Sequence, residues 1–221
     1  GACTGTVIDQ SLIITAGHCF SPSNYYEEGQ FFSYSPPVVL NEQREFVRYL
    51  APAELARLFK VDFNYQKAFV ASMSGVAPEY APYQFSLPVV ELADFAFEDP
   101  RFSNSKDYAV IRVRDPGARV KGYAIGWSKI AYRTARNSED LAVIQHPRGG
   151  YKQISVGTTG QGVVGLLNYP SISTEGGSSG AGLLAADGTL IGIHTRGGCD
   201  REEPNRGVHV QQIAKQLRAL Q

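Results

Sequence analysis

A β-prone stretch that ends in a histidine and a cysteine occurs near the start of the chain: Leu12-Ile13-Ile14-Thr15-Ala16-Gly17-His18-Cys19. A second β-prone run, residues 4–8, precedes it, and the dipeptide Asp9-Gln10 lies between the two runs. Short β-prone runs joined by a tight polar connection predict a hairpin. We therefore expect His18 to lie just beyond the second strand of a hairpin.

Strand patterns continue along the rest of the chain. The sequence has 23 glycines and 12 prolines, spread over its whole length together with many aromatic residues. Many short strands joined by such turns predict an all-β fold. Apolar residues at helical spacing over residues 210–220 predict an amphipathic helix at the end. The further strands are expected at residues 107–113, 141–145, 152–156, 182–185 and 189–194.

The composition restricts the classes of function. The 221 residues are 43% hydrophobic, which is enough for a sizeable core. The 21 basic residues balance the 21 acidic ones, which argues against broad electrostatic binding to nucleic acid or to an anionic membrane. No apolar run approaches the roughly 18 residues of a membrane span. We therefore expect neither nucleic acid nor a membrane as a partner.

The segment Gly176-Gly177-Ser178-Ser179-Gly180 predicts chemistry more directly than any other. Serine attacks a carbonyl only when a base removes its proton and donors stabilise the oxyanion. A glycine-rich turn can expose the hydroxyl and direct main-chain N–H groups into one pocket, although similar turns also occur without any chemistry. The candidate bases are His18, His146, His194 and His209. No Cys/His pair has zinc spacing and no phosphate-binding loop is present, so neither a metal nor a cofactor is expected.

Three motifs resemble those of chymotrypsin-like serine proteases. Thr15-Ala16-Gly17-His18-Cys19 is similar to the family's Thr-Ala-Ala-His-Cys, with Gly17 in place of the second alanine. Asp107-Tyr108-Ala109-Val110-Ile111 resembles the strand that carries the family's triad aspartate, and Gly177-Ser178-Ser179-Gly180 resembles its Gly-Asp-Ser-Gly. The three occur in the family's chain order of His, Asp and Ser.

The resemblance implies a role for each matching residue. Ser179 would be the nucleophile, His18 the general base, and Asp107 the residue that orients the imidazole. The main-chain N–H groups of Gly177 and Ser179 would form the oxyanion hole. Ser178 is a competing nucleophile, but it is not followed by glycine and stands where the family has Asp or Asn.

The resemblance also implies two six-stranded Greek-key β-barrels packed face to face, with the C-terminal helix at the end. Residues 1–117 would form the first barrel and residues 118–221 the second. The family's first strand has no counterpart before Cys3, so we expect it to be missing or to be supplied by a separate segment, and the chain to be a processed product. The interval from His18 to Asp107 is long. We expect an insertion near residues 41–100, including a short helix at residues 52–59, to form a loop or helical excursion over the cleft between the barrels. The acidic residues at 91–99 within it are interpreted as a solvated face.

The sequence has three cysteines, so at most one disulfide forms within the chain. The resemblance pairs Cys3 with Cys19 and leaves Cys199 as the odd thiol. Such a disulfide implies an oxidising compartment, hence secretion to the extracellular space or the periplasm.

Three further segments resemble the glutamyl endopeptidase (V8-like) branch of the family: Thr174-Glu175-Gly176-Gly177-Ser178-Ser179-Gly180, Ile191-Gly192-Ile193-His194 and Asn205-Arg206-Gly207-Val208. In that branch the residues that match Thr174 and His194 line the S1 pocket and bind an acidic P1 side chain. An imidazolium and a hydroxyl supply charge-assisted hydrogen bonds to a carboxylate. We expect Ser173 and Arg196 to belong to the same pocket.

The sequence thus predicts a secreted serine endopeptidase that acts on protein or peptide substrates through an acyl-enzyme, with a preference for Glu or Asp at P1. Two alternatives stay open. The first is a weak or inactive protease homologue that serves as a binding module, since Ser178 does not supply the carboxylate that supports the oxyanion loop in trypsin. The second is an esterase that uses the same site.

Overall fold

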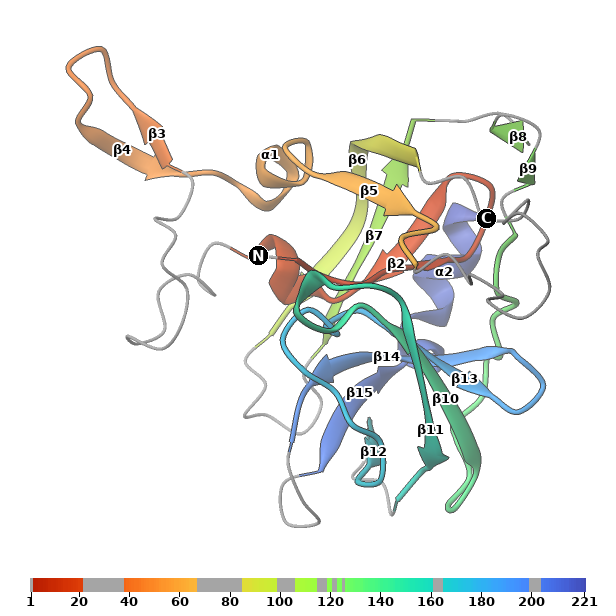
Figure 1. The fold of residues 1–221 in the computed structure, drawn as a ribbon. Helices are drawn as coiled ribbons and strands as arrows, with labels where there is room; N and C mark the ends of the chain where they lie inside the picture. The colour runs from red at the N-terminus through yellow and green to blue at the C-terminus, as the bar shows by residue number, and fades with distance from the viewer. Residues whose placement is uncertain are drawn as a thin grey trace, which may run out of the picture.

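Eleven strands form two antiparallel sheets in a computed structural model of the chain, and the other described strands form two separate two-stranded hairpins (Figure 1). The structure describes residues 2–21, 38–66, 85–98, 106–114, 119–120, 123–124, 126–160, 165–198 and 204–221. One sheet comes from residues before 114 and the other from residues after 139. The expected domain boundary at residue 117 lies outside the described residues.

The first sheet has five strands within the part of the chain that the structure describes. Its order is β1 (Thr6–Val7), β2 (Leu12–Thr15), β7 (Asp107–Val113), β6 (Phe85–Phe97) and β5 (Lys60–Phe63). The predicted hairpin is β1 and β2, and the predicted strand at 107–113 is β7 with the expected bounds. In the register of β2 with β7, Thr15 lies opposite Ala109, so the turn after β2 meets the start of β7.

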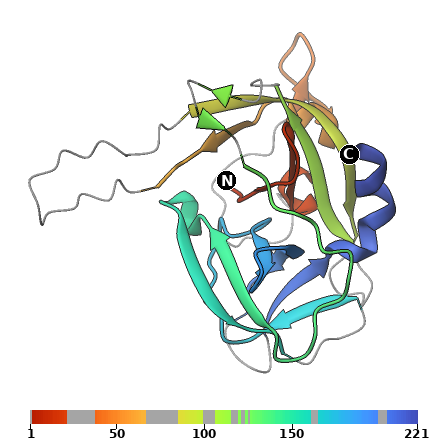
Figure 2. The same ribbon diagram turned by 90° about the vertical axis from the view of Figure 1, so that its right-hand side faces the viewer.

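The second sheet has six strands, the number that the family resemblance implied, and four of them lie where the sequence pattern predicted strands. Across it the order is β11 (Gln153–Thr158), β10 (Asp140–Gln145), β13 (Gly182–Ala185), β14 (Leu190–Arg196), β15 (Asn205–His209) and β12 (Leu166–Tyr169). Figure 2 shows this sheet curling below the first one, with both sheets wrapped around their own interiors. The predicted all-β fold is confirmed.

The central strands are buried on both faces, which explains their uninterrupted apolar sequences. In β2, Leu12 and Ile14 pack into the cluster between the two sheets, whereas Ile13 points into the interior of the first sheet. Successive strand side chains point to opposite faces, so a strand with two buried faces needs apolar residues throughout. The cluster between the sheets joins the two halves of the chain into one core.

The C-terminal helix closes this shared cluster. The chain forms a single turn of 3-10 helix, η4 (Val210–Ile213), followed by α2 (Ala214–Leu220). Val210, Ile213 and Leu217 are buried against residues of both sheets. The predicted apolar face is confirmed, although the helix is divided into two pieces.

The expected excursion at residues 41–100 is in large part sheet rather than loop or helix. A hairpin of β3 (Val38–Leu40) and β4 (Phe46–Tyr49) extends away from the two sheets (Figure 1). It is followed by the short helix α1 (Pro52–Ala56) and by β5, and the 13 residues of β6 then pair with β7. The expectation of a loop or helix was therefore wrong for residues 85–97, and residues 67–84 lie outside the described residues.

The acidic residues of β6 have specific partners. Glu91 accepts a hydrogen bond from Arg112 Nε at 2.8 Å on the exposed face, and Asp94 accepts one from the Tyr108 hydroxyl at 2.8 Å. The interpretation as a solvated face is correct for Glu91 alone of these two, because Asp94 lies in a partly buried contact. Among the described residues, no helix has the length and apolar character needed to cross a membrane.

Candidate active site

His18 and Asp107 lie together where the first hairpin meets β7. Asp107 Oδ2 is 2.8 Å from His18 Nδ1, and Asp107 Oδ1 accepts a hydrogen bond of 2.8 Å from the His18 main-chain N–H. Asp107 is 5% exposed, whereas the His18 side chain keeps 18% of its surface. A carboxylate that binds both the ring and the main chain of one histidine fixes the ring's position and leaves its Nε2 edge for other contacts.

Gly17 makes this pairing sterically possible. The residue lies in the short 3-10 helix η1 (Gly17–Phe20), directly after β2. A Cβ atom at position 17 would lie 2.2 Å from the Ala96 carbonyl oxygen and 2.8 Å from that of Tyr108. The departure from the family's alanine at this position therefore reflects close contact with the main chain of β6 and β7.

Residues 175–180, here called the serine turn, begin with a four-residue turn whose third position is Gly177. The geometry of that turn is one that glycine allows. Ser178 N–H donates to the Glu175 carbonyl at 2.9 Å, which closes a four-residue turn, and Gly177 has a φ of 95°. A type II turn requires a positive φ at this position, and glycine adopts it without steric cost. The Gly176 carbonyl accepts a hydrogen bond of 2.6 Å from Arg148 N–H. Since the C=O and N–H of a trans peptide point in opposite directions, the Gly177 N–H points away from Arg148.

The two serines of the turn differ in their surroundings. Ser178 is fully buried, and its Oγ accepts a hydrogen bond of 3.1 Å from the Glu175 N–H. Ser179 is partly exposed. Its accessibility agrees with the choice of Ser179 over Ser178 as nucleophile.

Contacts on both sides of Ser179 bring it to the histidine strand. The Ser179 carbonyl accepts a hydrogen bond of 2.8 Å from Thr4 N–H. Gly180 has a φ of 85°, and a Cβ there would lie 2.0 Å from Thr15 Oγ1 and 2.7 Å from Ala16 N. The serine turn is therefore in close contact with Thr15 and Ala16, which precede His18 in the sequence.

The disulfide between Cys3 and Cys19 ties the N-terminal residues to η1. Its sulfur atoms and a ring nitrogen of His18 all lie within 4.8 Å of one another. Because both sulfurs are bonded to each other, neither is available as a thiolate ligand for a metal. The predicted odd thiol, Cys199, lies outside the described residues.

The residues expected in the S1 pocket are brought to two facing segments. Thr174 Oγ1 donates to Asn205 Oδ1 at 2.6 Å, and a Cβ at Gly197, just after β14, would lie 3.5 Å from the same Thr174 oxygen. Ser173 is exposed, and its carbonyl accepts a hydrogen bond of 2.9 Å from Gln145 Nε2. Arg196, at the end of β14, is exposed as well.

Asn205 connects these segments and was not among the predicted site residues. It is 2% exposed, and its Oδ1 also accepts a hydrogen bond of 3.0 Å from Gly198 N–H. Its Nδ2 donates to the Ile172 carbonyl. Because the Thr174 O–H donates its hydrogen bond to Asn205 Oδ1, the Thr174 oxygen presents a lone pair rather than an O–H donor to a carboxylate in this arrangement.

His194 is buried beside Tyr169. It is 2% exposed, and its Nδ1 is hydrogen-bonded to the Tyr169 hydroxyl, which also donates to the Arg206 carbonyl at 3.1 Å. Burial, followed by the positive charge of nearby His18, lowers the pKa of His194 to about 4. The imidazole is therefore neutral near pH 7 in the free protein, contrary to the imidazolium that we expected.

The sequence analysis did not identify four residues that form hydrogen bonds to the serine turn or to the predicted S1 residues. They are Thr4, Arg148, Tyr169 and Asn205. Asn205 occurs in a motif that the sequence did flag, but Thr4 and Arg148 carry no signal of their own.

Two antiparallel sheets, a paired histidine and aspartate, and a serine turn against the residues before that histidine are typical of the chymotrypsin-like serine endopeptidases. The sequence model of the trypsin-like peptidase domain matches residues 3–193. The chain belongs to the trypsin-like peptidase domain family, and it is a serine endopeptidase that acts on peptide or protein substrates.

A solved structure of a Glu endopeptidase in complex with MPD is similar to the chain in fold. The similarity covers 100% of this chain and 87% of that one, with a TM-score of 0.58 and 19% sequence identity. A comparison with curated protein sequences gives no match.

Proposed function

We propose that the protein hydrolyses peptide bonds through an acyl-enzyme, with Ser179 as nucleophile, His18 as general base and Asp107 as the group that orients His18. The observation that carries the proposal is the double hydrogen bond from His18 to Asp107, at 2.8 Å for each contact, beside a serine turn pressed against Thr15 and Ala16. This arrangement supports one role for each of the three side chains.

The reaction follows from these roles. His18 Nε2 takes the proton of Ser179 Oγ while the oxygen attacks the scissile carbonyl, and Asp107 stabilises the imidazolium that forms. The N–H groups of Gly177 and Ser179 donate to the oxyanion. The imidazolium then gives its proton to the leaving amine, and water releases the acyl group from Ser179 by the same steps.

A preference for Glu or Asp at P1 is the second part of the proposal. Thr174 and His194 stand where the V8-like branch has its P1-binding residues, Ser173 and Arg196 lie on the same two segments, and the structurally similar protein is a Glu endopeptidase. When the Tyr169 hydroxyl donates to the Arg206 carbonyl, its oxygen accepts a hydrogen bond from the Nδ1–H of the neutral His194 ring, and Nε2 carries no proton. The free energy of binding a carboxylate therefore includes the protonation of His194. The imidazolium has a second proton at Nε2 for the substrate.

Secretion, or export to a periplasm, is the third part. The Cys3–Cys19 disulfide supports it, since such bonds persist in oxidising compartments and are rare in the cytosol.

The test is digestion of a diverse peptide library, read by mass spectrometry, with wild-type protein and with Ser179→Ala. We expect cuts that disappear in Ser179→Ala and that follow Glu or Asp. Cuts that persist in Ser179→Ala would refute the assigned nucleophile, and cuts after other residues would refute the P1 preference alone.

A further inference from the structure

Thr4 contacts the serine turn, the histidine strand and the loop after β10. Its Oγ1 donates to the Gly177 carbonyl at 2.8 Å and accepts a hydrogen bond of 3.0 Å from His146 N–H. Its main-chain carbonyl accepts a hydrogen bond of 2.6 Å from Thr15 Oγ1. Thr4 is 4% exposed, so these contacts are made away from solvent.

The two peptide units on either side of Gly177 are each held by one external donor. The Thr4 hydroxyl holds the carbonyl of Gly177, and Arg148 N–H holds the carbonyl of Gly176 at 2.6 Å. A type I turn differs from a type II turn mainly by reversal of the middle peptide, which here carries the Gly177 N–H. Since Gly176 and Gly177 both adopt either backbone conformation readily, the turn's own sequence does little to select one of them.

The ion pair that supports this turn in trypsin-like enzymes has no counterpart at the position before the proposed nucleophile. The position before the nucleophile is Ser178, which has no charge, and its Oγ stays within the turn by accepting from Glu175 N–H. The Arg148–Glu175 ion pair, with Nε and Oε2 2.5 Å apart, lies on the surface with the Arg148 side chain 82% exposed. Exposed pairs of this kind contribute little.

We propose that Thr4 is a positioning residue for the oxyanion hole. Its hydroxyl fixes the peptide unit between Gly177 and Ser178, which lies between the two peptide units that carry the Gly177 and Ser179 N–H groups, and so keeps both N–H groups directed at the oxyanion. This inference rests on the proposed roles of Ser179 and Gly177. Thr4 acts through the turn and does not touch the substrate.

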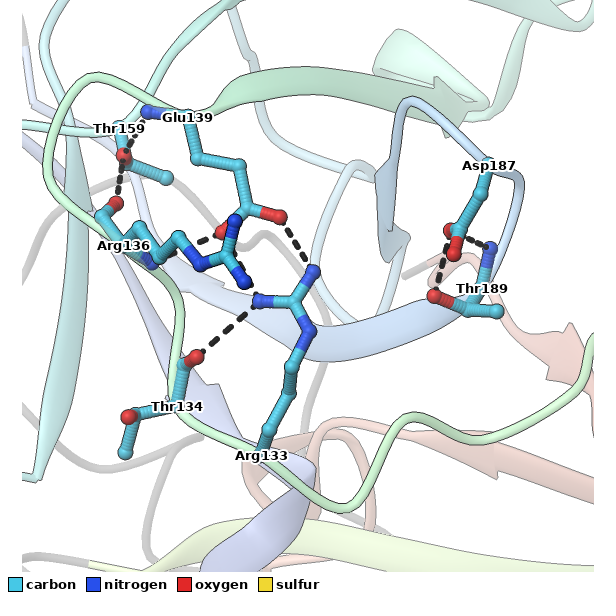
Figure 3. Close-up of polar contacts among 7 residues, drawn as sticks. All are labelled: Arg133, Thr134, Arg136, Glu139, Thr159, Asp187 and Thr189. Atoms are coloured by element: carbon cyan, nitrogen blue, oxygen red, sulfur yellow. Dashed lines mark hydrogen bonds and ion pairs between the residues drawn. The ribbon is translucent and has the colours of Figure 1, made fainter.

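Thr159 provides a matched control. It is also 4% exposed, its Oγ1 also donates to a main-chain carbonyl, that of Arg136 at 2.5 Å, and it also accepts from a main-chain N–H, that of Glu139 at 2.9 Å (Figure 3). Replacement by valine removes the same two hydrogen bonds at each position. The two variants therefore lose stability for the same reason, and only one of them borders the serine turn.

The experiment compares Thr4→Val, Thr4→Ser and Thr159→Val with wild-type protein. The readouts are kcat, KM, the thermal midpoint, and the inhibition constant of a peptide aldehyde, whose adduct with serine presents its oxygen to the oxyanion hole. Loss of a whole oxyanion donor lowers kcat by about 10²- to 10³-fold, so a misplaced donor should cost about 10- to 100-fold. We expect this loss in Thr4→Val, with an equal weakening of the aldehyde and KM within about threefold. Thr4→Ser and Thr159→Val should keep wild-type kcat and aldehyde affinity.

Retention of kcat and aldehyde affinity in Thr4→Val would overturn the inference, as would equal losses of activity in Thr4→Val and Thr159→Val. Should Thr4→Val fail to fold, Thr4→Ala removes the same hydroxyl. Its kcat and its aldehyde inhibition constant are then compared with those of wild-type protein and Thr159→Val in the same way. Ser179→Ala is measured in parallel. Full activity in that variant would overturn the proposed function, whereas activity that depends on Ser179 but not on the Thr4 hydroxyl would overturn only the inference about Thr4.

Discussion

Replacement of Asp107 by asparagine exchanges one carboxylate oxygen for an NH2 group in the residue that is hydrogen-bonded to His18. Both Asp107 oxygens accept hydrogen bonds from His18, one from Nδ1 and one from the main-chain N–H, each at 2.8 Å. Asparagine offers one acceptor oxygen and one NH2 group that can only donate, so one of these contacts becomes donor against donor. If the amide oxygen keeps the main-chain bond, the NH2 group donates to Nδ1 and moves the ring proton to Nε2, where the base must be free to take the Ser179 proton.

In the trypsin triad the corresponding change lowers kcat by about 10⁴-fold, or about 5 kcal/mol of transition-state stabilisation. We expect a loss of this order in Asp107→Asn, measured as kcat and kcat/KM on one peptide substrate between pH 6 and 9. Asp187→Asn is the matched control, because Asp187 accepts hydrogen bonds from the side chain and main chain of Thr189 in a remote turn (Figure 3). A loss below about tenfold in a folded Asp107→Asn protein would refute the orienting role.

Three further results are expected. The ratio of kcat/KM for P1 Glu to that for P1 Gln should rise as the pH falls from 8 to 6, because burial keeps the pKa of His194 near 4 in the free enzyme and binding of a carboxylate must draw a proton onto it; a ratio that does not change with pH would contradict this. Gly180→Ala should destabilise the fold by at least about 3 kcal/mol in urea unfolding, because its Cβ would lie 2.0 Å from Thr15 Oγ1 at a φ of 85°; a loss below about 1 kcal/mol would show that the turn can move away. Reduction of the Cys3–Cys19 disulfide, which spans 16 positions, should lower the free energy of unfolding by about 3 kcal/mol, and an unchanged urea midpoint would be the contrary result.

The elements that the sequence predicted well are those whose patterns are local. Strand β7 was predicted with its observed bounds because Tyr108, Val110 and Ile111 are all buried in a run of strand-forming residues. Strand β6 was missed because Pro88, Glu91 and Asp94 interrupt its pattern. The acidic pair is accommodated by Arg112 and Tyr108, which come from a different strand and are not identifiable as partners beforehand.

The site shows the same division between local and distant information. His18, Asp107 and Ser179 lie in short motifs, so each was predicted as a site residue from its neighbours in sequence. The Thr4 hydroxyl contacts Gly177, which lies 173 positions away, and Tyr169 contacts His194 over 25 positions. The neutral state of His194 follows from burial, which depends on packing rather than on the adjacent residues.

Covalent labelling with a fluorophosphonate tests the central claim most directly, because the reagent reacts with a serine only when a base and an oxyanion hole activate it. Mass spectrometry of the digested protein should place one label per chain on Ser179 and none on Ser178, and His18→Ala should abolish the labelling. A folded wild-type protein that takes no label, or that takes it on another serine, would contradict the proposed site.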